Sequence, residues 1–91
     1  MELRWARSAR RHGVNRERVR HVIDHSGLRF RIADAGAGAD ARYLYVGDDA
    51  EGIPLEVVAV QPGKGELLVI HAMSLRSKYE LEYREAQSWR V

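Results

Sequence analysis

The stretch "LLVIHAMSLRSKYELEYREA", residues 67–86, constrains the fold more than any other part of the chain. An apolar run that ends at His71 predicts a buried strand over residues 66–71. Ser74 is a suitable N-cap, and apolar and tyrosine residues then recur at helical spacing, which predicts a helix over residues 75–89. A strand therefore runs into a helix at a corner that gathers a histidine, an arginine, a lysine and two tyrosines.

A meander of strands is predicted upstream of this corner. Residues 43–46 and 54–60 are mostly apolar and bounded by turn residues, and short connections join them to the strand over 66–71. Short connections between successive strands favour antiparallel pairing. Residues 28–32 alternate apolar and basic side chains, which predicts a short edge strand, and the Gly- and Ala-rich residues 33–41 predict a loop.

Two helices are predicted before the first strand. The Arg- and Ala-rich residues 3–12 favour a short helix that Gly13 would end. Asn15 is a good N-cap for a second helix over residues 16–25. Its apolar residues fall on one face: Val19, Val22 and Ile23. The predicted fold is α+β, with two N-terminal helices, a four-stranded mostly antiparallel sheet and a C-terminal helix, the helices covering one sheet face.

Length and composition limit the number of domains and the compartment in which the protein can function. A chain of 91 residues has room for one core, so residues 1–91 are expected to form a single domain. The absence of cysteine excludes disulfides and thiolate metal sites, and it favours a reducing compartment such as the cytoplasm. The charged start lacks the apolar stretch of a signal peptide, and no apolar run is long enough to cross a membrane, so no membrane partner is expected.

The net charge of +2 hides a strong asymmetry along the chain. Residues 1–31 carry nine arginines against three acidic residues, whereas residues 32–66 carry seven acidic residues against two basic ones. Arginine contacts phosphate in a bidentate manner, so an Arg-rich segment indicates a polyanion such as RNA, or an acidic protein partner. A solvated helix face is the alternative interpretation of the same charges.

The strand-to-helix corner carries residues suited to phosphodiester chemistry. Strict alternation along the strand places His71 on the same face as Leu67 and Val69. Glu56 is the only charged residue inside its own strand. If Glu56, His71 and Arg76 converge on the open sheet face, they form an acid, base and cation set that needs no metal. RNA cleavage by internal transfer uses such a set: a base takes the 2′-OH proton, a cation stabilises the phosphorane, and an acid protonates the leaving oxygen.

Structural roles compete with these assignments. A histidine at a strand end can be a hydrogen-bonded structural group, and Glu56 can pair with Arg42 on a neighbouring strand. The two tyrosines of the last helix can pack in the core with a polar tip. The basic residues at the corner can be solvated helix charges. Among the remaining histidines, His21 and His25 are four residues apart, but no acidic third ligand has a fixed place beside them, so no metal is expected.

Separated stretches of the chain resemble a known family. The segment "ARRHGVNRERVRHVI", residues 9–23, is similar to the Lys-His-Gly-Val segment of BrnT-like toxins. The segments "RYLYVG", "LEVVAV" and "LLVIHAMSLRSKYELEYREA" follow in the strand, strand, strand, helix order of that family. On this resemblance, which spans residues 6–86, the chain is identified as a divergent member of the RelE/ParE-like toxin superfamily.

The resemblance implies a fold, an activity and a partner. The fold would be RelE/BrnT-like, and the protein would be a bacterial type II toxin that cleaves RNA without a metal or another cofactor. A cognate antitoxin would silence it, and oligomers could form through that antitoxin. The family's opening strand, Phe-x-Trp-Asp, is missing here, and Trp5 would be its remnant.

Only some of the family's motif residues are present in this sequence. Arg11 and His12 take the place of the family's Lys-His, and Tyr83 falls on the family's tyrosine. Met73 stands where the family has an arginine that is a phosphate ligand. Arg76 is the candidate replacement for that arginine.

The sequence therefore predicts a metal-independent endoribonuclease toxin. The catalytic candidates are His71, Arg76 and Glu56. The RNA-binding candidates are Arg7, Arg10, Arg11, His12, Arg42, Lys78 and Tyr83. The expected partners are RNA and a cognate antitoxin. The alternative function, which the methionine at the family's arginine position favours, is a non-catalytic protein- or nucleic-acid-binding module.

Overall fold

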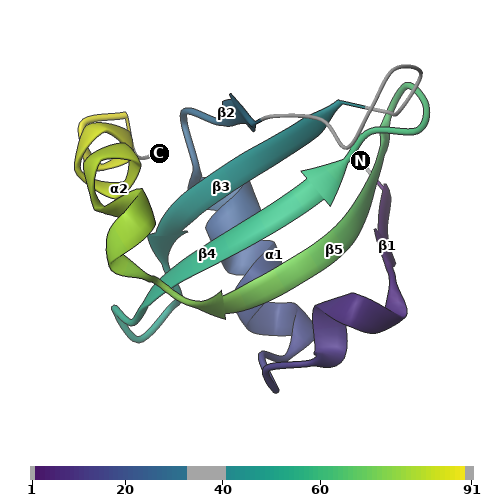
Figure 1. Cartoon of the computed structure of the whole chain (residues 1–91), viewed down its shortest axis with the longest axis horizontal. Coiled ribbons are helices and arrows are strands. Elements are labelled where there is room, and N and C mark those ends of the chain that lie inside the picture. The colour runs from purple at the N-terminus through teal and green to yellow at the C-terminus, as the bar shows by residue number, and fades with distance from the viewer. Residues whose placement is uncertain (1, 33–40, 90–91) are drawn as a thin grey trace.

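A computed structural model describes residues 2–32 and 41–89, and its centre is a five-stranded sheet (Figure 1). The N-terminal elements are strand β1 (Glu2–Trp5), the 3-10 turn η1 (Arg7–Arg10), helix α1 (Arg16–His25) and strand β2 (Phe30–Ile32). The remaining elements are strands β3 (Arg42–Asp48), β4 (Pro54–Val60) and β5 (Glu66–Ser74), the 3-10 turn η2 (Ser77–Tyr79) and helix α2 (Glu80–Gln87). Except for Ala41, the loop predicted over residues 33–41 lies outside the described residues.

The sheet is mixed, with strand order β1-β5-β4-β3-β2. Strand β1 runs parallel to β5, and the other neighbouring pairs are antiparallel. The prediction of two N-terminal helices and a four-stranded mostly antiparallel sheet is therefore wrong, although the α+β class holds. The meander of β3, β4 and β5 and the edge position of β2 agree with the sequence pattern.

The first predicted helix, over residues 3–12, is replaced by β1 and η1. Leu3 pairs with Leu67 across the parallel ladder and is 9% exposed, while its neighbour Arg4 is exposed. This inside-outside alternation is the pattern of a strand, and pairing with a distant segment overrides the local helix preference of the Arg- and Ala-rich sequence. Of the two predicted N-terminal α-helices, only α1 is present.

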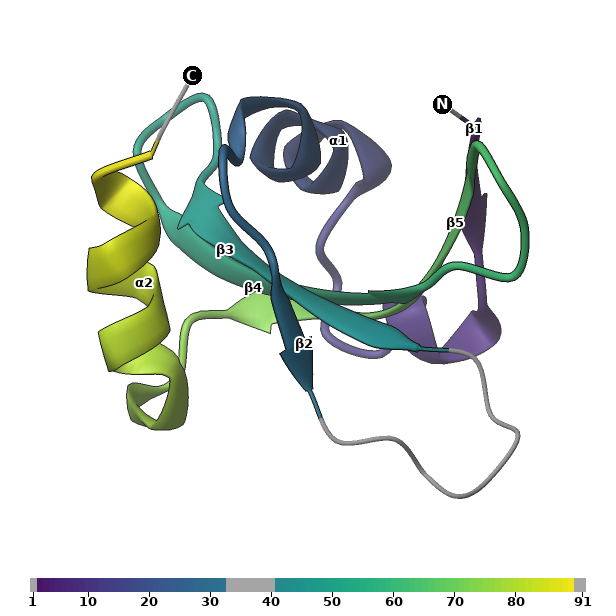
Figure 2. The same cartoon turned by 90° about the horizontal axis from the view of Figure 1, so that it is seen from above.

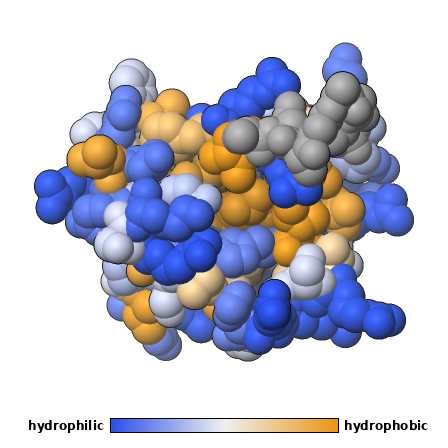
Figure 3. Space-filling view, viewed as in Figure 1, coloured by the Kyte–Doolittle hydropathy of each residue, from blue (hydrophilic) through white to orange (hydrophobic). Residues whose placement is uncertain are grey.

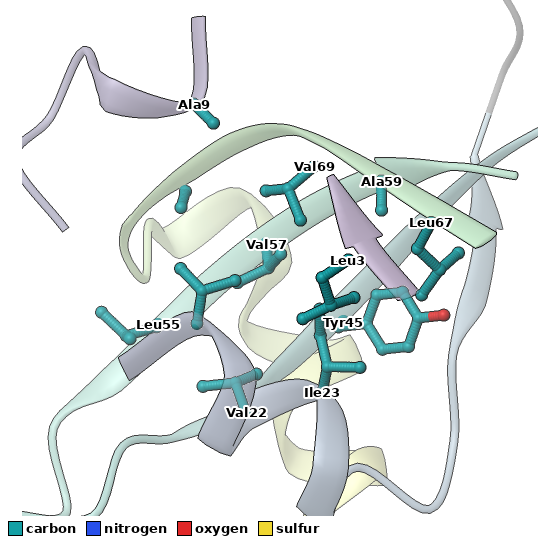
Figure 4. Packing of buried hydrophobic residues seen from close by; sticks show 12 residues of the cluster. Leu3, Ala9, Val22, Ile23, Tyr45, Leu55, Val57, Ala59, Leu67 and Val69 are labelled. Atoms are coloured by element: carbon teal, nitrogen blue, oxygen red, sulfur yellow. The ribbon is translucent and has the colours of Figure 1, made fainter. Parts of the chain in front are cut away.

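Helix α1 matches its prediction and covers one face of the sheet (Figure 2). The side chain of Asn15 accepts a hydrogen bond from the Arg18 backbone N at 3.0 Å, as an N-cap does. The apolar face of α1 packs with inward residues of four strands and with Ala9 of η1 (Figure 4). The buried members of this first core cluster are Leu3, Ala9, Val19, Val22, Ile23, Tyr45, Leu55, Val57, Ala59, Leu67, Val69 and Ala72.

Helix α2 packs on the opposite face, so the prediction that the helices cover a single face is wrong. The second core cluster buries Leu44, Val46, Val58 and Ala86, and the partly buried Tyr79 and Tyr83 pack against it. Figure 3 shows apolar surface that stays visible on this face beside α2. No helix within residues 2–32 and 41–89 has the length and apolar character needed to span a membrane.

The strand-to-helix corner comes later in the chain than predicted. Ser74 pairs with Leu55 and is the last residue of β5, so it is not a helix N-cap. The Leu75 backbone N then donates to the Pro54 carbonyl at 3.2 Å, which keeps the chain extended beyond the strand. Helix α2 consequently begins at Glu80 rather than at residue 75.

A bulge in β5 changes which side chains share a face. Val58 pairs with His71 and Ala59 pairs with Val69, so Ile70 is an extra residue in the ladder. A bulge interrupts strict alternation, and here Val69 and Ala72 both face the first cluster. His71 lies with Ile70 on the α2 face. The prediction that His71 shares a face with Val69 is therefore wrong.

Candidate functional site

A buried carboxylate, Glu56, forms the centre of the candidate site. Its side chain is 0% exposed. His71 Nε2 lies 2.9 Å from Glu56 Oε2, and Arg76 Nε and Nη2 donate to the same oxygen at 2.9 and 2.5 Å. The Arg76 backbone N donates to Oε1 at 2.8 Å. The structure thus brings together the three residues that the sequence singled out as catalytic candidates.

Three local features of the chain produce this convergence. Glu56 lies on the α2 face of β4, because Leu55 and Val57 on either side point into the first cluster. The bulge turns His71 onto that same face. Arg76 has extended backbone angles, φ −99° and ψ 155°, so its N–H and its side chain both point back to Glu56. Arg76 therefore lies outside helix α2, and its placement in the helix predicted over residues 75–89 is wrong.

The carboxylate is held in its charged form. Burial raises the pKa of Glu56, but the hydrogen bonds from Arg76 and His71 and the positive charge of Arg76 outweigh burial, so the pKa lies below its usual value. The hydrogen bond with Glu56 in turn raises the pKa of Arg76. Glu56 is therefore an acceptor that positions its partners, and it does not exchange a proton near neutral pH.

His71 is the group of this cluster that can carry a proton. An ionised carboxylate only accepts hydrogen bonds, so we assign the proton of the neutral ring to Nε2, and Nδ1 remains as the basic nitrogen. The His71 side chain is 24% exposed and that of Arg76 is 42% exposed. Both side chains are accessible to a ligand from solvent, while the buried Glu56 binds them from the protein interior.

The Arg-rich N-terminal segment lies beside this cluster. The rings of His12 and His71 are in edge-to-face contact, with centroids 5.6 Å apart. Arg7 and Arg10 of η1 and Arg11 after it have exposed side chains. The structure thus places an exposed basic segment and a second imidazole next to the predicted catalytic residues.

The other RNA-binding candidates are spread over the structure. Arg42 pairs with Val60, at the other end of the β3–β4 ladder from Glu56, so a Glu56–Arg42 pair does not form. The Lys78 ammonium lies 5.0 Å from the Tyr79 ring centre. Tyr83 packs against the second cluster, and its hydroxyl donates to Asp48 Oδ1 at 2.5 Å. Roles of these residues in RNA binding stay predictions.

The sequence gives no sign of one residue, Ser8, that contacts the strand carrying His71. The Ser8 hydroxyl donates to the carbonyl of Ile70, the bulged residue of β5, at 2.6 Å. No local pattern marks Ser8, because both the 3-10 turn and the bulge result from long-range packing. The helix predicted over residues 3–12 also gives no reason to connect this serine with β5.

A hollow of about 600 Å³ lies away from the Glu56 cluster, between α1 and the β3–β4 turn. Arg18 Nε donates to Asp49 Oδ2 at 2.8 Å inside it, and Asp49 Oδ1 accepts the backbone N–H groups of Glu51 and Ile53. The bond from Ile53, together with those from Arg18 and Glu51, outweighs burial and lowers the pKa of Asp49. Asp49 thus has the bonding of a residue that holds a turn.

No family model, curated protein or solved structure was found to match the chain. Within residues 2–32 and 41–89, no group of three or more histidine, cysteine or acidic side chains is arranged to hold a metal ion. The geometry of Glu56, His71, Arg76 and His12 is therefore the basis for the functional argument below.

The Glu56 cluster is expected to contribute strongly to stability. Glu56→Gln should lower the free energy of unfolding at pH 7 by about 1.5–3 kcal/mol, because the donors of Arg76 and His71 lose a charged acceptor. Glu80→Gln is the matched control, since Glu80 pairs with Arg84 on the exposed side of α2 at 3.3 Å. That change should cost about 0.5 kcal/mol or less. If denaturant unfolding shows equal losses of unfolding free energy in the two variants, Glu56 does not have this stabilising role.

The same carboxylate predicts a dependence of stability on pH. The folded-state pKa of Glu56 lies below the ordinary value of 4.5, so its contribution is fully present above pH 4.5 and is lost as the pH falls through the folded-state pKa. Wild-type protein should lose stability below that pH more steeply than Glu56→Gln. Parallel stability curves for the two proteins would show that Glu56 is not stabilised in its charged form.

Proposed function

We propose that this chain is a metal-independent endoribonuclease, the toxin of a type II toxin–antitoxin pair. The observation that supports this proposal most is the cluster in which Glu56 holds His71 and Arg76 at a partly exposed position beside His12. The local resemblance of residues 9–23 to BrnT-like toxins supports the biological context.

The proposed reaction is internal transfer at a phosphodiester. His71 Nδ1 takes the proton of the 2′-OH, the 2′ oxygen forms a bond to phosphorus, and the bond from phosphorus to the 5′ oxygen breaks. The leaving 5′ oxygen receives a proton from a protonated imidazole, for which His12 lies nearest to His71. Arg76 faces the negative charge that develops on the non-bridging oxygens of the phosphorane. The products are a 2′,3′-cyclic phosphate, which water can open to a 3′-phosphate, and a free 5′-OH.

RNA binding is assigned mainly to the N-terminal arginines. Arg7, Arg10 and Arg11 are exposed, and the turn that carries them leads directly to His12. Phosphates bound by these arginines would bring a neighbouring phosphodiester toward the two histidines. Because the substrate is cellular RNA, we place the activity in the cytoplasm.

The expected regulator is an antitoxin with an acidic segment. An acidic partner would bind the same arginines as RNA. This competition explains both why the antitoxin binds the toxin and why RNA cleavage stops when it does. Pairing of such a partner with a sheet edge is a further way to strengthen the complex, because edge strands offer free backbone groups.

A non-catalytic binding module is the second candidate function. Two observations favour it: Met73 occupies the position of the family's arginine, and the charge of Arg76 is already matched by Glu56. In that case the protein would bind RNA or a partner without cleaving it. Cleavage by the purified protein distinguishes the two functions.

His71→Ala is expected to lower the rate of RNA cleavage by about 10²–10⁴-fold, the usual effect of losing a general acid–base group. Wild-type activity should persist in EDTA, and the products should carry 2′,3′-cyclic or 3′-phosphate ends. His25→Ala is the matched control, because His25 is an exposed histidine of α1 that stacks on His21. A wild-type protein that cuts neither free nor ribosome-bound RNA would favour the binding module.

Arg76→Lys tests the cation with less damage to the fold than alanine. Lysine keeps the charge near Glu56 but loses the planar fork that supplies two donors to one oxygen. We expect cleavage to fall by about 10²–10³-fold, as for loss of one donor to the transition-state charge. Arg84→Lys, on the outer side of α2, serves as control and should retain wild-type rates.

RNA affinity is expected to fall steeply with salt, because phosphate contacts release counterions. Replacing Arg7, Arg10 and Arg11 together by alanine should flatten the slope of log affinity against log salt by about two to three units. Replacing three basic residues elsewhere, Arg20, Lys64 and Arg84, removes the same charge and should change the slope less. Equal slopes for the two triple variants would move the RNA site away from η1.

The antitoxin should form a stable complex that raises the melting temperature of the toxin, since a ligand that binds only the folded state stabilises it. Expression of the chain together with its neighbouring genes, followed by purification, tests for the complex. Thermal unfolding of the purified complex measures the change in melting temperature. The arginine triple variant should weaken the complex. A chain that is harmless when expressed alone and that retains no partner would count against the toxin assignment.

A further inference from the structure

We propose that Ser8 is a positioning residue that acts through the β5 bulge to keep His71 on the face of Glu56. The catalytic consequence rests on the proposed function, whereas the structural consequence does not. Ser8 does not touch the Glu56 cluster; its hydroxyl contacts the backbone that orients the histidine.

The argument begins with the strand itself. An extra residue in one strand leaves that residue's backbone groups without their regular ladder partners. The extra residue here is Ile70, and its carbonyl accepts the Ser8 hydroxyl at 2.6 Å. A backbone carbonyl that lacks a partner favours rearrangement, so this hydrogen bond stabilises the bulged form over a regular ladder.

The position of Ser8 is itself fixed from both sides. The Ala6 backbone N donates to the Val69 carbonyl at 2.9 Å, which attaches the start of η1 to β5 just before the bulge. Ala9 is 3% exposed and lies in the first core cluster. The chain between these two anchors holds the hydroxyl against the strand, so little conformational freedom is lost when the bond forms.

The bulge decides where His71 points. In a regular β5 all side chains would alternate, and His71 would join Val69 and Leu67 in the first core cluster, away from Glu56. In the bulged strand, Ile70 and His71 lie together on the α2 face, and His71 Nε2 reaches Glu56 Oε2 at 2.9 Å. A hydroxyl on η1 thereby controls a hydrogen bond that it does not take part in.

The same segment approaches His71 a second time through His12, whose ring lies edge-to-face on the His71 ring. The turn η1 therefore touches the histidine's strand through Ser8 and is followed by a residue that touches its side chain. A partner that binds the exposed arginines of η1 would act on both contacts.

The test compares Ser8→Ala with Ser8→Thr and Ser26→Ala. Threonine keeps the hydroxyl, and Ser26 is a matched control because its hydroxyl also donates to a backbone carbonyl, that of Leu28, at 2.7 Å and away from the site. Nuclear magnetic resonance of the histidine ring nitrogens reports the His71 Nε2–H bond to Glu56. We expect Ser8→Ala to shift or broaden that signal, and Ser8→Thr and Ser26→Ala to preserve it.

The catalytic readout follows the spectroscopic one. If RNA is cleaved, Ser8→Ala should lower kcat by about 5- to 30-fold and leave KM for RNA unchanged. This factor corresponds to about one to two kcal/mol, the free energy of the hydrogen bond that holds His71 in place. Ser8→Thr should restore kcat. If wild type cleaves no RNA, the proposed function fails, and the His71 signal still decides this inference.

Deletion of Ile70 gives a second, independent test. Without the extra residue, Val69, His71 and Ala72 alternate regularly, so His71 keeps its face and the bulge carbonyl is gone. Ser8→Ala should then have no further effect on the His71 signal, which is a strongly non-additive result. The proposal is overturned if Ser8→Ala behaves like Ser26→Ala in the full chain, or if its effect is the same with and without Ile70.

Discussion

The ionised, fully buried carboxylate of Glu56 is the constraint on which the C-terminal half of the structure depends. A buried charge costs several kcal/mol unless donors surround it, so the chain must bring donors to this point of β4. Arg76 supplies three of them, two from its side chain and one from its backbone, and His71 supplies the fourth. The extended residues between β5 and η2 follow from this requirement, because a helix beginning at residue 75 would turn the Arg76 N–H away from Glu56.

The β5 bulge is the second condition, because it decides which of two faces receives His71. One strand must place Val69 and Ala72 in the first core cluster and His71 beside Glu56, and strict alternation cannot satisfy all three. One extra residue, Ile70, resolves the conflict. Its carbonyl is bonded from η1, so the N-terminal segment and the candidate site belong to one structural unit even though they lie far apart in the sequence.

Sequence reasoning succeeded where local signals and structure agree. Helix α1 has an N-cap and an apolar face, and β4 has turn residues on both sides, so both were predictable. It failed at β1, where the Arg- and Ala-rich composition favours a helix, but the parallel partner β5 lies more than sixty residues away and leaves no local trace. The sequence raises the convergence of Glu56, His71 and Arg76 only as a condition, and the structure meets it. The face predicted for His71 is wrong, because a bulge cannot be predicted from alternation alone.

On the proposed function, the charges of the site explain why RNA binding and chemistry would reside in different segments. Glu56 and Arg76 form an ion pair, so their opposite charges together offer little net attraction to a polyanion. Attraction for a polyanion would have to come from exposed cations, and the exposed arginines of η1 precede His12, whose ring contacts that of His71. On the proposed function, the asymmetric charge distribution of the chain corresponds to two separate roles: the N-terminal segment would attract the polyanion, and the Glu56 cluster would orient the groups that act on it.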